Sequence, residues 1–594
     1  MESYIKTHKE HIDSLLDEIL KIEYININNI ILSILSGNFS TNLLSTPSTS
    51  NSIINNASSV ISSVEKLHSF LKRWCIEKNG DLAGYIYINL QNRTSKKSKG
   101  QYFTPPSIVN KIVEDTITKE NYENIKILDP ACGSGQFLIA AFSKLLHFHL
   151  QDNHDAKEAS LHIVSKNLFG IDLDPIALEI CKFNLHSIAG NFNANLNLTK
   201  ANALEKNTLY FSNEVNNKLF DYVFANPPWG AKLSSSEKSH YRKEFSCSQS
   251  GINSFTLFLE RAVELLEEKG KLGFLIPEAY LNIKAHEKSR KDLLSFGKLK
   301  TIHLWGEQFK TVFAPSISII FEKTLENKNE NVVQIVGKEE MKKNTMRLVP
   351  QKYFSKTPNT IFNINYSGKT EFLLETLSLD NCIYLHDNAK FFLGIVTGKN
   401  KETLFTEKTE EHPDPIIVSQ DIKPYKIRDA HTFFKFNPED LQQSAPQAFY
   451  KTTNKFLYRF IGNRLTFALD TKGNYSINNA NGFIPTSLFL SNETILSLLN
   501  SSLIQYYYHN SFFTLKVLKG NLEKIPLKII SKDTQDKLAK LTFDITQSNN
   551  ENYIKTTMEN IDDIVFHEYG INDKNAFKVY NTFSPAQLSQ DMIN

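Results

Sequence analysis

The spacing of hydrophobic positions changes several times along the chain and predicts its organisation. In residues 1–22 apolar side chains recur every three to four positions, which predicts an amphipathic helix. Residues 36–58 are rich in Ser, Thr and Asn, as loops are, and residues 59–78 again show helical spacing. We therefore expect an N-terminal helical segment over residues 1–95.

Between residues 96 and 325, short apolar runs alternate with helical periods. The runs lie at residues 125–129, 167–172, 221–225, 271–276, 301–305 and 316–322. Helical patterns, such as those over 175–187 and 254–268, separate most of them. This alternation is typical of an α/β domain with a mainly parallel sheet, whose ligands bind at the carboxyl ends of the strands.

The remaining sequence predicts a second domain of α+β type. Residues 326–384 have mixed character, and we interpret them as a connector. Residues 385–530 contain glycine turns and short strand-like runs, followed by a helical pattern near 494–508. Residues 531–594 are polar and helical, which predicts a C-terminal helical extension.

Charge and composition narrow the class of protein only slightly. The 594 residues are 41% hydrophobic and 22% charged, as in globular proteins. A formal net charge of +3 neither supports nor excludes nucleic-acid binding, so a phosphate-binding surface must be a local patch. One candidate is the run of Arg93, Lys96, Lys97 and Lys99, which a solvated loop explains equally well.

The five cysteines are odd in number and too widely spaced for a zinc pattern. We therefore expect neither a disulfide framework nor a metal site, and we expect a cytoplasmic protein. No apolar run reaches the length of a membrane span, so we expect no membrane association.

The strongest chemical signal is an apolar strand that ends in Asn226-Pro227-Pro228-Trp229. Two prolines cannot donate to a sheet, so the strand stops and a stiff turn follows. The side-chain oxygen of Asn226 and the backbone carbonyl of Pro227 could accept hydrogen bonds from an aromatic amine such as adenine N6. Trp229 offers a flat face on which a base could stack. A proline-rich turn without function is the alternative, because four residues also occur by chance.

The second signal is a glycine loop over residues 127–135, after the first strand of the α/β domain. Glycines let the backbone approach a ligand closely. Leu138 stands where a dinucleotide fingerprint has its third glycine, and the Lys-Ser/Thr of a phosphate loop is missing. The loop suits an amino-acid tail and a ribose better than a pyrophosphate.

The third signal is Asp172, which ends the second strand one βα unit downstream. A carboxylate at this place can accept both hydroxyls of a ribose. Asp174 and Pro175 are expected to cap the helix that follows.

These three signals, in this order, resemble the amino-methyltransferases that use S-adenosylmethionine. A fourth, Gln101-Tyr102-Phe103-Thr104-Pro105, looks like the motif that precedes the catalytic core in gamma-class adenine-N6 DNA methyltransferases of the TaqI type. Residues 270–277 continue the family pattern, and the resemblance covers about residues 80–325. It implies a Rossmann-like S-adenosylmethionine-dependent methyltransferase core over 96–325.

The resemblance also implies roles for individual residues. Thr104 and its neighbours, with Asp129 and Gly133, would contact the amino-acid end of S-adenosylmethionine, and Asp172 would hold its ribose. Asn202 would accept a hydrogen bond from the cofactor's adenine, where the family often has Asp. Phe313 is a candidate for a second stacking face on the substrate base, although a core phenylalanine is the plainer interpretation. The full set of expected cofactor-binding residues is Tyr102, Thr104, Asp129, Ala131, Gly133, Asp172, Leu173, Asn202 and Ala203.

The C-terminal half resembles a TaqI-type target-recognition domain at residues 392–398, 499–503 and 518–526. The resemblance implies double-stranded DNA with a specific recognition sequence as the partner. It further implies N6-adenine methylation of a flipped-out base in a restriction–modification or related defence system. We expect a monomer, with any restriction endonuclease on a separate chain.

Other functions use the same turn. Cytosine N4 in DNA is the second candidate acceptor, although those enzymes more often carry Ser in place of Asn226. Enzymes that modify ribosomal guanine or a glutamine amide are usually shorter and lack a large recognition region. A DNA-binding protein with an inactive methylase core is a further alternative. A fused nuclease is disfavoured, because residues 1–100 contain no convincing nuclease cluster.

Overall fold

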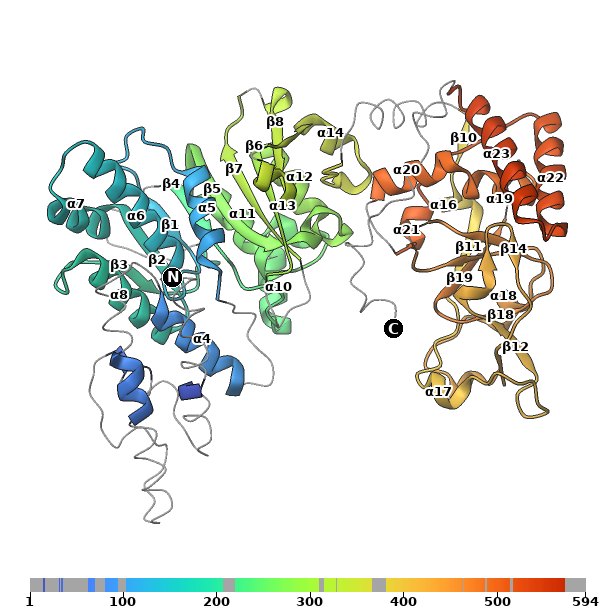
Figure 1. Ribbon diagram of the computed structural model, residues 1–594, viewed down its shortest axis with the longest axis horizontal. Helices are drawn as coiled ribbons and strands as arrows, with labels where there is room; N and C mark the ends of the chain where they lie inside the picture. Colours follow the sequence, from blue (N-terminus) through green and yellow to red (C-terminus); the bar gives the residue numbers. More distant parts are fainter. Residues whose placement is uncertain are drawn as a thin grey trace, which may run out of the picture. The chain divides into compact units, whose positions relative to one another are not determined.

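The chain forms two compact units, residues 1–362 and 363–594 (Figure 1). The computed structural model describes residues 14–16, 31, 34–35, 62–69, 81–94, 103–206, 219–308, 315–326, 328–343, 345–365, 381–462, 464–486, 489–512 and 516–571. Within the predicted N-terminal helices, residues 14–16 and 62–69 are helical. The other residues of those helices, and the expected loop at 36–58, lie outside the described residues, as does the basic run from Lys96 to Lys99.

The first unit is built on a sheet whose strand order is β3-β2-β1-β4-β5-β7-β6-β8-β9. The strands are β1 (Ile127–Asp129), β2 (Leu168–Asp172), β3 (Asn197–Lys200), β4 (Phe220–Ala225), β5 (Leu266–Pro277), β6 (Gly297–Gly306), β7 (Ser316–Lys323), β8 (Val332–Val336) and β9 (Arg347–Pro350). Strands β3, β2, β1, β4 and β5 run parallel, whereas β7 is antiparallel to β5 and β6. The parallel part confirms the α/β sheet that the sequence predicts.

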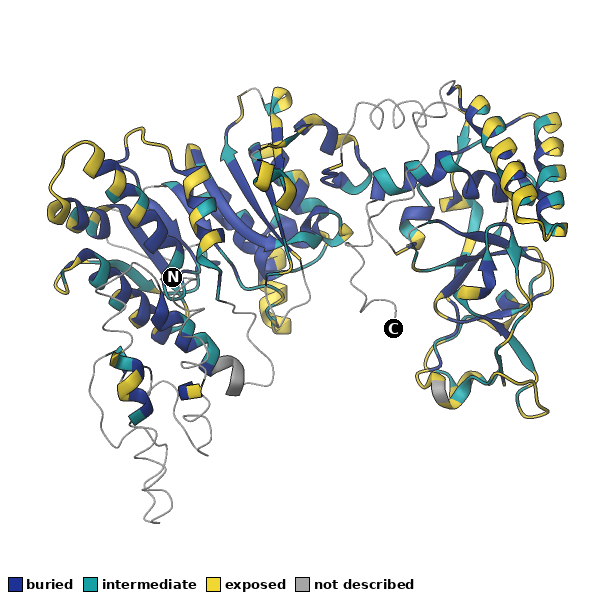
Figure 2. Ribbon diagram, in the orientation of Figure 1, coloured by how far each residue is buried: buried dark blue, intermediate teal, exposed yellow. Residues whose placement is uncertain are grey.

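Helices cover this sheet and bury its apolar strands. They are α4 (Leu82–Thr94), α5 (Pro106–Thr116), α6 (Gln136–Gln151), α7 (Ala156–His162), α8 (Pro175–Ala189), α10 (Ser235–Glu244), α11 (Ser254–Leu265), α12 (Glu287–Phe296), α13 (Lys338–Lys343) and α14 (Gln351–Lys356). One core cluster joins Ile127 and Phe224 of the strands to Ile112, Phe137 and Phe142 of α5 and α6. Figure 2 shows the strands buried and the outer helix faces exposed.

The first unit extends beyond the boundary expected at residue 325. Residues 328–362, which the sequence analysis assigns to a connector, contain β8, β9 and α14. In β8, exposed and buried residues alternate over most of its length, so its short apolar signal is easily taken for a loop. The buried Arg290 of α12 donates hydrogen bonds to the carbonyls of Asn359 and Thr360 and fixes the end of this extension.

The second unit has a four-stranded antiparallel sheet of order β11-β19-β16-β17, with shorter strand pairs and a group of helices. Its strands are β10 (Cys382–Ile383), β11 (Ala389–Phe392), β12 (Asp414–Ile417), β13 (Ile422–Lys423), β14 (Lys426–Ile427), β15 (Phe433–Phe434), β16 (Lys455–Arg459), β17 (Phe467–Asp470), β18 (Tyr475–Ser476), β19 (Ala480–Pro485) and β20 (Leu527–Lys528). Its helices are α16 (Leu385–Asn388), α17 (Asn400–Thr403), α18 (Gln447–Lys451), α19 (Asn492–Asn500), α20 (Ser502–Phe512), α21 (Lys519–Leu522), α22 (Lys532–Gln547) and α23 (Glu551–Glu568).

The helix predicted near 494–508 is two helices, α19 and α20. Ser501 between them has the extended backbone angles φ −64° and ψ 150°. Asp562 of α23 accepts hydrogen bonds from the backbone N–H of Ser502 at 2.7 Å and from its hydroxyl at 2.5 Å. Asp562 thus caps the first residue of α20, so that a new helix begins there. Hydrophobic spacing alone does not reveal this break, because the capping residue is distant in sequence. Among the described helices of either unit, none is long and apolar enough to cross a membrane.

The sheet of the second unit contains a buried ion pair between Lys455 and Asp470, whose side chains are 0% and 1% exposed. The Lys455 ammonium also donates to the carbonyls of Tyr450 and Thr452 at 2.6 and 3.1 Å. Asp470 in turn accepts hydrogen bonds from the backbone N–H groups of Lys472 and Asn474. Both charges are therefore fully hydrogen-bonded, as a buried pair requires.

We predict that Asp470→Ala lowers the free energy of unfolding by about 3–5 kcal/mol, because it leaves the buried Lys455 ammonium uncompensated. Urea unfolding followed by circular dichroism measures the change. Asp429→Ala is the matched control, since the Asp429–Lys472 pair lies at the surface and is screened by solvent. If both variants lost the same free energy of unfolding, burial would not make the Lys455–Asp470 pair more important for stability than a surface pair.

Candidate active site

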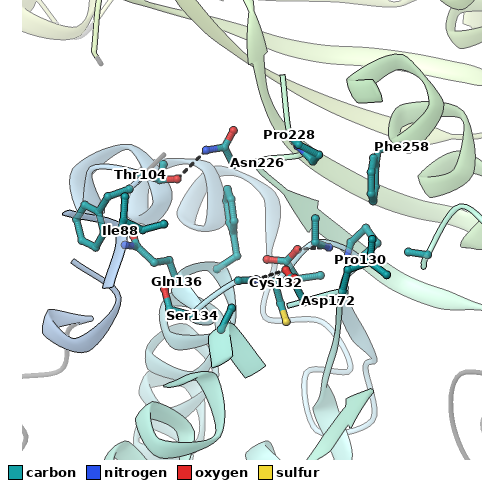
Figure 3. Close-up of a pocket in the computed structure, with 18 of the residues that line it drawn as sticks. Ile88, Thr104, Pro130, Cys132, Ser134, Gln136, Asp172, Asn226, Pro228 and Phe258 are labelled. Carbon is teal, nitrogen blue, oxygen red and sulfur yellow. Dashed lines mark hydrogen bonds between the residues drawn. The ribbon is translucent and has the colours of Figure 1, made fainter. Parts of the chain in front are cut away.

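A cavity lies in the first unit where the carboxyl ends of β1, β2 and β4 meet (Figure 3). The predicted site residues that line it are Thr104, Asp129, Ala131, Gly133, Asp172, Leu173, Asn202, Ala203, Asn226 and Pro228. The predicted Tyr102 and Phe313 lie outside the described residues. Pro227 is buried, and Trp229 is half-buried and packs against the core cluster of the sheet; neither is among the residues that line the cavity.

The glycine loop between β1 and α6 forms one wall of this cavity. Gly133 and Gly135 have φ angles of +52° and +92°, in the left-handed region that favours glycine. A Cβ on Gly133 would meet nothing within 4 Å, whereas one on Gly135 would lie 2.7 Å from the Cys181 sulfur. Gly133 therefore leaves open space beside its backbone, and Gly135 permits close packing on α8.

Two carboxylates, the buried Asp129 and the half-buried Asp172, give the cavity an acidic floor. Asp129 accepts a hydrogen bond from the Ala131 N–H at 3.0 Å. Asp172 accepts one from the Gly133 N–H at 2.8 Å and one from the Asp174 N–H at 2.8 Å. Burial raises the pKa of Asp172 and raises that of Asp129 well above its usual value. A positively charged ligand would offset this desolvation and favour the ionised carboxylates.

Asp174 caps α8, as the sequence predicts. Its Oδ1 accepts hydrogen bonds from the N–H groups of Ile176 and Ala177, and Pro175 occupies the first helical turn. Its Oδ2 accepts a hydrogen bond of 2.6 Å from the Tyr87 hydroxyl. The cap therefore also ties the loop after β2 to α4.

The turn after β4 holds Asn226 at the edge of the cavity. Asn226 Nδ2 donates to Thr104 Oγ1 at 2.9 Å (Figure 3). Its Oδ1 is buried and has no hydrogen-bond partner among the described residues. A buried acceptor without a donor is costly, so the site is poised for a donor from a ligand.

Ser254, the first residue of α11, stabilises the residues that follow Asn226 in this turn. Its hydroxyl donates to the Pro228 carbonyl at 2.5 Å and accepts from the Ala231 N–H at 3.2 Å. The two prolines stiffen the chain on one side of these contacts. The position of Asn226 is thus fixed both by backbone rigidity and by α11.

Asn202 lines the cavity, but its side-chain amide already forms hydrogen bonds with neighbouring residues. Asn202 Oδ1 accepts a hydrogen bond from the Leu204 N–H at 3.1 Å. Its Nδ2 donates to Glu205 at 3.2 Å and to the Tyr241 hydroxyl at 3.0 Å. The oxygen expected to face a ligand therefore already has one donor and could accept a second.

The lining residues that sequence reasoning missed include Tyr87 and Ile88 on α4, and Phe258 on α11. Apolar side chains at helical spacing look like ordinary core positions, so their pattern carries no functional signal. The position of α4 directly before the segment at 101–105 is the one clue in the sequence that could have found the first two.

Comparison with known proteins identifies the domain that contains this site and the domain that follows it. Residues 78–362 match the family model described as N-6 DNA Methylase, which ends where the first unit ends. Residues 414–527 match the TaqI-like C-terminal specificity domain. The chain thus contains an N-6 DNA methylase domain followed by a TaqI-like specificity domain.

The relatives agree with this assignment. Type II methyltransferase M.VspI of Vibrio sp. (strain 343) is 27% identical over 344 residues, which are 58% of this chain and 75% of that protein. Type II restriction enzyme and methyltransferase RM.Eco57I of Escherichia coli is 26% identical over 257 residues. That match spans 35% of this chain and about a quarter of the relative (26%).

A solved structure shows the same fold over nearly the whole chain. The Type IIL restriction–modification enzyme MmeI, in complex with DNA, superposes with a TM-score of 0.58 at 13% identity. The match covers 93% of this chain and 88% of that one. Together with the two family models, this likeness of fold confirms the expected architecture of an α/β methyltransferase core followed by a specificity domain.

We predict that Ser254→Ala loosens the turn that holds Asn226. Removal of the Pro228 and Ala231 hydrogen bonds should lower the free energy of unfolding by about 1–3 kcal/mol and should also lower kcat. Ser248→Ala is the matched control, because Ser248 is equally buried and its hydroxyl donates to the Phe245 carbonyl outside the cavity. Urea unfolding and steady-state rates measure both effects; a similar change of kcat in the control would contradict the assignment.

Proposed function

We propose that this chain transfers a methyl group from S-adenosylmethionine to N6 of an adenine turned out of double-stranded DNA. The buried, unpartnered Oδ1 of Asn226 carries the proposal, because the substrate amine is the donor that it lacks. An adenine inside a duplex cannot reach a pocket at the edge of a sheet, so the base must leave the stack.

The cavity fits S-adenosylmethionine, which supplies a methyl group on a positively charged sulfonium when bound. Asp129 would accept the ammonium of its amino-acid end beside the open backbone of Gly133. Asp172 would accept the ribose hydroxyls, and Asn202 and Ala203 would border the adenine. The apolar Ile88 and Phe258 face the same space. The sulfonium and the ammonium of this ligand suit a cavity lined by the carboxylates of Asp129 and Asp172.

Asn226 prepares the amine for reaction. The lone pair of adenine N6 is delocalised into the ring, so the amine is a weak nucleophile. Hydrogen bonds from its two protons to Asn226 Oδ1 and to the Pro227 carbonyl would localise that lone pair. Thr104 keeps the amide oriented with its oxygen free, and Trp229 would support the base. The rate gain comes from positioning and charge stabilisation rather than from a strong base.

We predict N6-methyladenine as the product when the protein is incubated with DNA and S-adenosylmethionine. Mass spectrometry of the released nucleosides measures it. N4-methylcytosine in its place would refute the choice of base, and cofactor binding without any methylated nucleoside would support an inactive core.

The variant Asn226→Ala gives the matched control for this assay. We expect its turnover to fall about 100-fold or more, because the amine loses its acceptor, while its affinity for S-adenosylmethionine is retained. Calorimetry measures that affinity without DNA. Near-normal turnover in this variant would remove the role of Asn226.

The second unit offers cations for the DNA backbone. Lys423 on β13, Arg428 after β14 and Arg459 on β16 form no ion pair among the described residues. Arg459 donates from Nε to the carbonyl of Ile422, beside Lys423. Burial lowers the pKa of Lys423, and the charges of Arg428 and Arg459 lower it further. Asp421 is the carboxylate near them, and it accepts from the Val418 N–H. A phosphodiester bound between these cations would reduce their mutual repulsion.

We predict that Arg428→Ala weakens DNA binding and makes the slope of log affinity against log salt shallower by about 0.9 for each phosphate that the protein no longer neutralises. Fluorescence anisotropy over a salt series measures both. Lys472→Ala is the control, since Lys472 is exposed but already paired with Asp429. An unchanged salt slope in Arg428→Ala would exclude this cluster from the DNA interface.

The biological setting follows from the substrate. We propose that the chain is the modification methyltransferase of a bacterial or archaeal restriction–modification or related defence system. It would act as a cytoplasmic monomer on one DNA sequence, with any restriction endonuclease on a separate chain. Sequencing modified bases in the host DNA, with and without the gene, tests this setting and reveals the recognition sequence.

A further inference from the structure

Asp81, the residue before α4, joins three segments around the cofactor cavity. Its carboxylate is buried and accepts hydrogen bonds from the Gly84 N–H at 2.7 Å, from Asn184 Nδ2 at 2.8 Å and from the Ser134 hydroxyl. These donors belong to α4, to α8 and to the glycine loop. Asn184 Nδ2 also donates to the Ser134 carbonyl at 2.9 Å, so the loop is held twice.

Gly84 makes this contact possible. A Cβ at Gly84 would lie 2.2 Å from Asp81 Oδ2 and 2.2 Å from Ser134 Oγ, which is far inside contact distance. Glycine destabilises a helix relative to alanine. Its presence in the first turn of α4 is therefore explained by the close approach of the Asp81 carboxylate and the glycine loop.

Tyr87 makes the second connection from α4. Its hydroxyl donates to Asp174 Oδ2 at 2.6 Å, and the Asp174 N–H in turn donates to Asp172. Burial raises the pKa of Tyr87, and the bond to Asp174 raises it further, so the hydroxyl stays a donor. Asp81, Gly84 and Tyr87 are spaced by three residues and lie on one side of the helix.

Helix α4 thus bridges the two loops that carry the acidic cofactor-binding residues. The Asp81 end is bonded to the loop after β1, and the Tyr87 end to the loop after β2. Tyr87 and Ile88 also line the cavity themselves, and Ile88 is among the lining residues labelled in Figure 3. No motif in the sequence assigns α4 to the site.

We propose that α4 is part of the cofactor site, with Ile88 and Tyr87 as its wall and Asp81 and Tyr87 as positioning residues that hold the two loops apart at the separation the cofactor requires. The inference rests on the proposed cofactor, S-adenosylmethionine, and it concerns cofactor affinity rather than methyl transfer or DNA binding.

The test is the affinity of Tyr87→Phe for S-adenosylmethionine, measured by calorimetry on the full chain without DNA. This change removes the hydrogen bond to Asp174 and leaves the ring in place. We expect the Kd to rise about tenfold, the scale of one missing hydrogen bond to a charged group. The KM for the cofactor should rise by a similar factor, while kcat at saturating cofactor and the Kd for DNA stay unchanged.

Tyr122→Phe is the matched control. Tyr122 is as deeply buried as Tyr87, and its hydroxyl donates to Asp152 at 2.8 Å outside the cavity. It should keep the cofactor Kd of the unchanged protein. A purely structural role of Tyr87 would instead lower the melting temperature in both variants and move the cofactor Kd in neither.

Two further variants keep the proposal testable if one change harms folding. Asp81→Asn should raise the cofactor Kd, because Ser134 donates to Oδ2 and Asn184 to Oδ1, and an amide has only one of these two oxygens. Its control is Asp562→Asn, which alters a half-buried carboxylate bonded to Ser502 in the other unit. Ile88→Ala, at a half-buried position, should weaken cofactor binding without touching either hydrogen-bonded connection.

The outcomes separate this inference from the proposed function. Unchanged cofactor affinity in both Tyr87→Phe and Ile88→Ala would overturn the role of α4 while the unchanged protein still binds S-adenosylmethionine. An equal loss of DNA affinity would also overturn it. If the unchanged protein binds no S-adenosylmethionine, the cofactor assignment itself fails, and the inference fails with it.

Discussion

The hydrogen bond from the Gly133 N–H to Asp172 joins the two loops on which the active site depends. The loops follow β1 and β2, which run parallel, so both emerge at the same edge of the sheet. Strand β4 pairs with the other side of β1 and brings Asn226 to that edge. The left-handed Gly133 lets its N–H point at the carboxylate. If the loops moved apart, the acidic floor and the acceptor at Asn226 would no longer face one space.

Much of this site could be predicted from the sequence because its signals are local. Asp129, Asp172 and Asn226 each mark the end of a short apolar run, where a charge, a glycine loop or a proline pair stops a strand. Parallel pairing then brings such ends together, whatever lies between them in the chain. The cap formed by Asp174 and Pro175 is also local, and the structure confirms it.

The features that could not be predicted depend on contacts between distant residues. Tyr87 and Phe258 lie on helices whose apolar spacing is that of any core helix. The break before α20 depends on Asp562, about sixty residues downstream, and the sheet extension at β8 and β9 depends on partners rather than on its own weak pattern. Trp229 illustrates the same limit: the sequence shows an aromatic residue beside Asn226, but only packing shows that it contacts the core cluster.

The charges of the two units have different consequences for a nucleic acid. The described residues that line the cavity include the carboxyl groups of Asp129 and Asp172 and no lysine or arginine, so the cavity offers a phosphate no cationic partner. The cluster of Lys423, Arg428 and Arg459 instead favours phosphate. Under the proposed roles, one surface would not meet both demands, because cations that hold the backbone would compete with the cofactor's ammonium for Asp129. With the proposed roles in separate units, the strength of DNA binding can change without altering the pocket that we propose for methyl transfer.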